Sequence, residues 1–100
     1  MMPSYESFCN ASRFFVEMKD DDGELGKIPV SLIRATVVVS VPCANGQIAK
    51  VAFAKTNRGQ TFRDSRSPKK NITAAECLSE LKRMLQSNND GEMAFQTLIV

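Results

Sequence analysis

Residues 35–55 read ATVVVSVPCANGQIAKVAFAK and carry the strongest structural signal in the chain. The β-branched run ATVVVSV predicts a strand, and its nearly continuous apolar character favours a central position in a sheet. The pair Asn45-Gly46 separates it from a second strand-like run, and both residues accept the positive φ of a type I′ turn. The stretch therefore predicts an antiparallel hairpin of residues 35–43 with residues 47–55.

The segment upstream of this hairpin predicts a further strand. Residues 13–19 read RFFVEMK, and their alternation places Phe14, Val16 and Met18 on one face. Residues 20–23, DDDG, predict a turn, because Asp and Gly tolerate the left-handed conformations of tight reversals. A strand followed at once by a chain reversal is therefore expected.

Three shorter segments complete the predicted sheet. Pro29 interrupts the apolar run at residues 27–33, which predicts an edge segment or a single turn. Residues 57–59, NRG, predict a second reversal, and residues 60–63 a third strand of a meander. The tail MAFQTLIV at residues 93–100 predicts a final strand, whose pairing partner the sequence leaves open.

One amphipathic helix is predicted after residue 72. Thr73 can cap its N-terminus, and Glu76, three residues later, completes a capping box by accepting from the N–H of the cap. The stretch SNNDG from residue 87 ends the helix. Four residues at helical spacing form its apolar stripe: Ala74, Leu78, Leu81 and Leu85.

These elements predict an α+β fold, with a small, mostly antiparallel sheet (a β-meander), one amphipathic helix packed on one face and a C-terminal strand. One hundred residues suit a single domain, and the apolar fraction of 43% is enough for a modest core. Residues 1–12 show no periodicity, so we expect a loose or briefly helical N-terminal arm. The single α+β domain is expected to span residues 13–100.

The composition argues against an enzyme. The chain contains no His, which removes the commonest general base and metal ligand near neutral pH. Cys9, Cys43 and Cys77 are widely spaced, so reduced thiols are expected and a structural zinc site is not. Cys77 lies beside the apolar stripe, which favours burial over a nucleophilic role. We therefore predict no catalytic residue, no cofactor and no metal.

The most distinctive feature is a cationic window at residues 50–70. It holds seven cations and a single acid, Asp64, a net charge of +6, whereas the whole chain carries only +2. A local field of that size attracts polyanions or acidic protein surfaces. Its cations are Lys50, Lys55, Arg58, Arg63, Arg66, Lys69 and Lys70.

Two interpretations of this window are open. In one, Lys50 points away from the buried Val51 and Phe53, the other cations project from turns and loops, and all of them contact phosphates. In that case Phe62 could stack on an unpaired base, although a ring in a short strand near a helix is more often buried. In the other, the cations lie on solvated loops and balance acids elsewhere in the chain.

Two resemblances concern the end of the window. Ser67-Pro68-Lys69-Lys70 is similar to the minor-groove-binding repeats of linker-histone tails and to proline-directed kinase sites. The order of meander, lysine-containing loop and helix resembles the C-terminal half of a double-stranded RNA-binding domain, which implies phosphate contacts by Lys69 and Lys70. The chain departs from that domain because residues 71–73 separate the lysines from the helix start, no amphipathic helix precedes the first strand, and an extra strand follows. No family is assigned.

Three functions follow as hypotheses. The first is a small, non-enzymatic accessory protein that binds DNA or RNA through phosphates. The second is a protein-binding module or inhibitor that docks on an acidic partner surface, as small viral or mobile-element antagonists do. The third is a homodimeric structural subunit that associates through the open sheet face or through the edge strand near Pro29. No apolar stretch reaches the length of a membrane span and no export signal is evident, so no membrane contact and a cytoplasmic location are expected.

Overall fold

The computed structural model describes residues 5, 9–10, 14–42, 46–56, 59, 61–86 and 98–99. The elements are, in chain order, β1 (Phe15–Lys19), β2 (Leu25–Pro29), α2 (Val30–Arg34), β3 (Thr36–Pro42), β4 (Ile48–Lys55), β5 (Thr61–Asp64), β6 (Asn71–Thr73), α3 (Ala74–Gln86) and β7 (Leu98–Ile99). All strand pairs are antiparallel. The α+β class and the antiparallel meander are confirmed.

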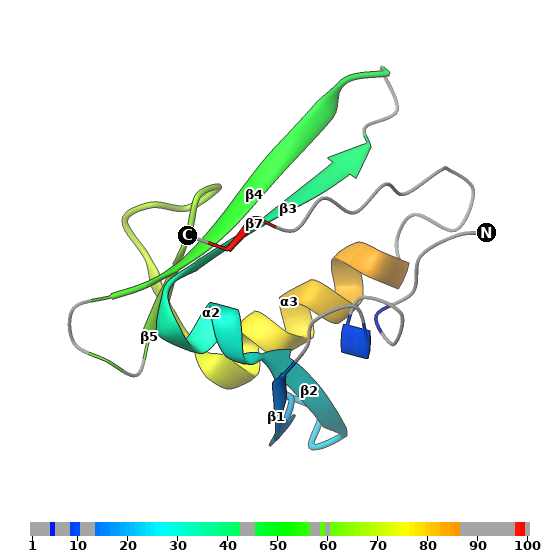
Figure 1. The fold of residues 1–100 in the computed structure, drawn as a ribbon, viewed down its shortest axis with the longest axis vertical. Coiled ribbons are helices and arrows are strands. Elements are labelled where there is room, and N and C mark those ends of the chain that lie inside the picture. Colours follow the sequence, from blue (N-terminus) through cyan, green and yellow to red (C-terminus); the bar gives the residue numbers. More distant parts are fainter. Residues whose placement is uncertain are drawn as a thin grey trace.

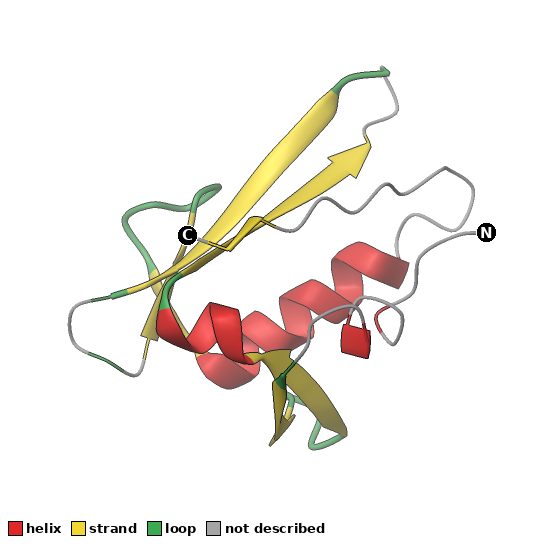
Figure 2. Ribbon diagram, viewed as in Figure 1, coloured by secondary structure: helices red, strands yellow, loops and turns green. Residues whose placement is uncertain are grey.

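The strands are divided between two sheets, with α3 between them (Figures 1 and 2). β1 pairs only with β2, and the other five strands form a second sheet in the order β6-β5-β4-β3-β7. The first predicted strand therefore does not join the main sheet. Pro29 ends β2 and α2 follows at once, so the chain leaves the small hairpin before it enters β3. Both structures proposed for residues 27–33, an edge segment and a turn, are present.

The β3–β4 hairpin forms as predicted, but its register does not fit a two-residue turn. Pro42 lies opposite Ile48, whereas a turn at residues 45–46 alone would place it opposite Ala49. The observed register sets Val39 opposite Val51, and both side chains are buried. A one-residue slip would put a core residue opposite one from the other face, so core packing fixes the register. Gly46 has a φ of 82°, while Asn45 lies outside the described residues.

The capping box of α3 is confirmed. Thr73 Oγ1 accepts from the N–H of Glu76 at 3.2 Å, and Glu76 Oε1 accepts from the N–H of Thr73 at 3.1 Å. Residues 71–73, for which the sequence predicted no strand, form β6 and pair with β5. On the helix, Leu78 and Leu81 are buried as predicted, while the side chain of Leu85 lies outside the described part.

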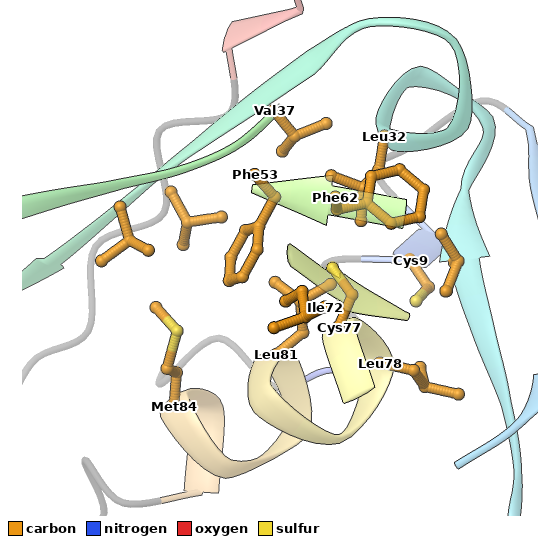
Figure 3. Packing of buried hydrophobic residues seen from close by; sticks show 13 residues of the cluster. Cys9, Leu32, Val37, Phe53, Phe62, Ile72, Cys77, Leu78, Leu81 and Met84 are labelled. Atoms are coloured by element: carbon orange, nitrogen blue, oxygen red, sulfur yellow. The ribbon is translucent and has the colours of Figure 1, made fainter. Parts of the chain in front are cut away.

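The core lies between α3, α2 and the inner face of the main sheet (Figure 3). Phe53 from β4 is fully buried in this cluster, and its ring points toward Ile72 of β6 and Leu81 of α3 in Figure 3. Cys9 is also buried, and Tyr5 packs against the same cluster. These two residues of the predicted loose arm therefore belong to the folded core, because their apolar surface is removed from water. The domain boundary at residue 13 stays a prediction.

Candidate nucleic-acid interface

Two cations of the window project from the outer face of the main sheet, which is turned away from the core. In β4, Val51 and Phe53 point into the core, so alternation points Lys50 to the opposite face, where it is exposed. Arg63 of β5 is exposed and lies opposite Ala54, which shares the face of Lys50. Antiparallel neighbours directly opposite each other point to the same side of a sheet. Lys50 and Arg63 therefore share one face.

The spacing of these two cations suits a polyanion. Arg63 lies opposite Ala54, four residues along β4 from Lys50. At about 3.3 Å per residue and about 4.8 Å between strands, their Cα atoms are roughly 14 Å apart. That separation equals about four steps along one strand of duplex DNA. Two small side chains of β4, Ala52 and Ala54, lie between the two cations on this face.

Arg66 does not share this face, because it is bound to acids beside α3. Its Nη2 lies 2.5 Å from Asp64 Oδ2 and 2.9 Å from Glu80 Oε1. Glu80 is also bound by Arg83, one helical turn later. Arg66 is therefore part of a chain of alternating charges that attaches the loop after β5 to the helix. No local pattern in the sequence predicts the bond between Arg66 and Glu80, and only the i, i+3 spacing of Glu80 and Arg83 indicates part of this network.

The acids of this network are ionised at neutral pH. Burial by itself would raise the pKa of Asp64, but hydrogen bonds from Arg66 outweigh it and hold the pKa below its usual value. Burial also raises the pKa of Glu80, but hydrogen bonds from Arg83 and Arg66 outweigh it, so the pKa of Glu80 is below its usual value. Arg66 is held in its charged form mainly by its hydrogen bonds to Asp64, which raise its pKa. Its charge is thus neutralised within the protein.

Lys69 and Lys70 are exposed on the loop of residues 65–70. The loop is held by two turns, in which Ser67 N donates to Asp64 O and Lys70 N donates to Ser67 O. Ser65 is hydrogen-bonded in both directions to the backbone of Ala52, so the loop begins alongside β4. None of Lys50, Arg63, Lys69 and Lys70 forms an ion pair within the described part of the chain.

Lys70 lines a groove of mixed charge between this loop and α3. The groove has a volume of about 440 Å³. Acids outnumber cations among its lining residues, which are Asp21, Asp64, Arg66, Ser67, Lys70, Ile72, Glu76, Ser79, Glu80 and Arg83. An anion would meet as much repulsion as attraction there. The groove is therefore a poor phosphate site.

The other predicted contacts are in different surroundings. Lys55 is half-buried and alternates with Lys50, so it is directed toward the other side of β4. Phe62 is 3% exposed and belongs to the core, so its ring is not available to stack on a base. Arg58 lies outside the described residues. The structure therefore divides the cations of the window among the outer face of the main sheet, the loop of residues 65–70 and the charge network beside α3.

The thiols that the structure describes are buried. Burial raises the pKa of Cys77, and the nearby charges of Asp64 and Glu80 raise it further. Burial also raises the pKa of Cys9, which donates a hydrogen bond to the carbonyl of Lys27. Both are protonated near neutral pH and therefore unsuited to nucleophilic attack. In the described part of the chain, no three Cys, Asp or Glu side chains converge as metal ligands would.

Comparisons of the chain with protein-family models, with curated proteins and with solved structures gave no match. Neither helix within the described ranges has the length and apolar character needed to cross a membrane. Any functional assignment therefore rests on the chemistry of the surface.

Proposed function

We propose that this protein is a small, non-enzymatic nucleic-acid-binding protein that contacts phosphates through the outer face of its main sheet. The observation that supports the proposal best is the exposure of Lys50 and Arg63 on one face, with small side chains between them. Lys69, on the loop that begins beside β4, adds a third cation. The absence of an available ring at Phe62 favours backbone contacts over base stacking, so little sequence preference is expected.

The proposal is tested by fluorescence-anisotropy titration of labelled single-stranded and double-stranded DNA and RNA at several salt concentrations. If Lys50, Arg63 and Lys69 each replace one counterion of a DNA duplex, log K should fall with log salt with a slope of about −2.7. Changing Lys50 and Arg63 together to Gln should reduce that slope by about 2 and weaken binding to all sequences alike.

A matched control separates this surface from net charge alone. The pair Lys19→Gln and Arg34→Gln removes the same charge from exposed positions outside the window. The control pair should retain most of the affinity. Equal losses in the two variants would show that only overall charge matters, and no binding at low salt would refute the proposal.

The second candidate, binding to an acidic protein surface, uses the same cations and predicts a different result. Nucleic acid should then bind weakly and without preference among the four probes. A protein partner should instead be retained by the unmodified chain and lost in the Lys50→Gln/Arg63→Gln variant. The anisotropy titration thus decides which candidate to pursue.

A further inference from the structure

The outer edge of β1 has free backbone hydrogen-bonding groups. Phe14 O accepts from Val30 N at 3.0 Å, and Asp20 N donates to Glu24 O at 2.9 Å, so even-numbered residues face β2. Alternation then points the N–H and C=O groups of Phe15, Glu17 and Lys19 away from β2. None of these groups has a partner within the described ranges. Such an edge is a template for pairing with another strand.

The corresponding edge of β2 is protected. Lys27, opposite Glu17, donates its N–H to Tyr5 Oη at 2.8 Å and accepts from Cys9 Sγ at 3.5 Å. The N-terminal segment therefore satisfies β2 on the side away from β1. Only the β1 edge of this small sheet keeps three consecutive outward-pointing residues without such protection among the residues described.

The same hairpin exposes large apolar side chains. Phe14 is 66% exposed and Leu25 63% exposed, and Phe15 and Val16 are also exposed. No proline or bulge interrupts β1, although proteins commonly protect edges with such features. Exposed apolar groups beside an unpaired edge are typical of surfaces that pair with another strand.

We propose that the outer edge of β1 pairs antiparallel with β1 of a second copy of this chain, about a two-fold axis at Glu17. In this register Phe15 of each copy lies opposite Lys19 of the other, and Val16 lies opposite Met18. All three outward-pointing residues then find backbone partners, which gives about six inter-chain hydrogen bonds. The proposal does not rest on nucleic-acid binding.

The side chains of β1 suit this self-pairing. Lys27 Nζ already lies 4.1 Å from the ring centroid of Phe15 on the β2 side, so the ring takes part in a cation–π contact. Lys19 of the second copy approaches the same ring from the outer side. The two Glu17 carboxylates meet at the axis, and each lies between its own Lys27 and, diagonally, Lys19 of the other copy. The like-charge contact of the two Glu17 carboxylates opposes pairing, and these lysines offset it only in part.

Proline substitution at the outer edge tests the proposal. Glu17→Pro removes an N–H that points away from β2, so the β1–β2 bonds are retained. Glu17→Thr is the matched control, since it keeps the N–H and removes the like-charge contact at the axis. We expect the unmodified chain to change from monomer to dimer over roughly 5–500 μM in sedimentation equilibrium, as suits a small interface. Glu17→Pro should remain monomeric, and Glu17→Thr should lower the dissociation constant about two- to five-fold.

Two further measurements make the result decisive. Lys19→Pro removes another outward N–H and should also abolish the dimer, which covers the case in which Glu17→Pro fails to fold. In the unmodified chain, hydrogen exchange at the amides of Phe15, Glu17 and Lys19 should slow at high protein concentration. A monomer at all concentrations, a dimer that survives both proline variants, or a dimer without protection of these amides would each overturn the proposal.

Discussion

Arg66 forms a side-on, bidentate ion pair with the carboxylate of Asp64, with Nε 3.0 Å from Oδ1 and Nη2 2.5 Å from Oδ2. Asp64 is only 6% exposed and lies opposite Phe53, on the core-facing side of β5. A carboxylate in that position needs a partner, because an uncompensated charge near the core is costly. The ion pair therefore stabilises the edge of the core. Arg66 belongs to the cationic window for which the sequence suggested phosphate contacts, but here it has a structural partner.

Replacing Arg66 should cost stability more than binding. We expect Arg66→Gln to lower the free energy of unfolding by about 2 kcal/mol, between the values of surface and buried pairs. Arg66→Lys should recover only part of this loss, since an ammonium cannot form the side-on contact. Urea denaturation measures the change. Arg63→Gln is the control: it should leave stability nearly unchanged and weaken nucleic-acid binding, and the reverse order would contradict these two roles.

The protein should lose stability in acid. The fold lowers the pKa of four carboxyl groups, those of Asp20, Asp64, Glu76 and Glu80. The hydrogen bond from Lys82 is the main cause at Asp20, and the hydrogen bonds from Thr73 are the main cause at Glu76. A lowered pKa gives stability that is complete above the unfolded value of about 4 and is lost as pH falls through the folded value. Urea midpoints should therefore be flat from pH 7 to about 5 and fall below that. In the Asp64→Asn variant the urea midpoint should fall less steeply below about pH 5. An unchanged pH profile would show that Asp64 does not contribute to the loss of stability in acid.

Gly26 should not tolerate a side chain. A Cβ there would lie 2.8 Å from Lys82 Cε and 3.0 Å from Leu78 Cδ2, because α3 packs closely on β2. Lys82 cannot easily move aside, since its Nζ is 3.0 Å from Asp20 Oδ2. We expect Gly26→Ala to destabilise the fold by about 1–2 kcal/mol. In a Lys82→Ala background the cost should shrink, and strict additivity in the double-mutant cycle would argue against this contact.

The capping box should stabilise α3 measurably. Thr73→Ala removes the hydroxyl that accepts from Glu76 N and should cost about 1 kcal/mol in thermal or urea unfolding. Thr73→Ser keeps the hydroxyl and should cost clearly less. Equal losses in the two variants would point to the methyl group or to β6 rather than to the cap.

The sequence was sufficient where neighbours along the chain decide the structure. The alternation of Lys50 with Val51 and Phe53 predicted which face of β4 is buried. The spacing of Thr73 and Glu76 predicted the start of α3. Part of the candidate site follows from the same rule, because alternation alone predicts that Lys50 points away from the core.

Contacts between distant residues decided the rest. Arg66 is bound by Glu80, which lies one β-strand and two helical turns later in the chain. The position of the β1–β2 hairpin depends on the bond between Lys82 and Asp20, which are 62 residues apart. Such pairs have no local period, so the sequence alone could not distinguish a solvated cation from one bound to a carboxylate. The sequence thus determined most of the strands, the long helix α3 and the buried face of β4 through local periodicity. Only the tertiary structure decided the register, the two sheets and which cations of the window stay free, because these depend on packing between segments.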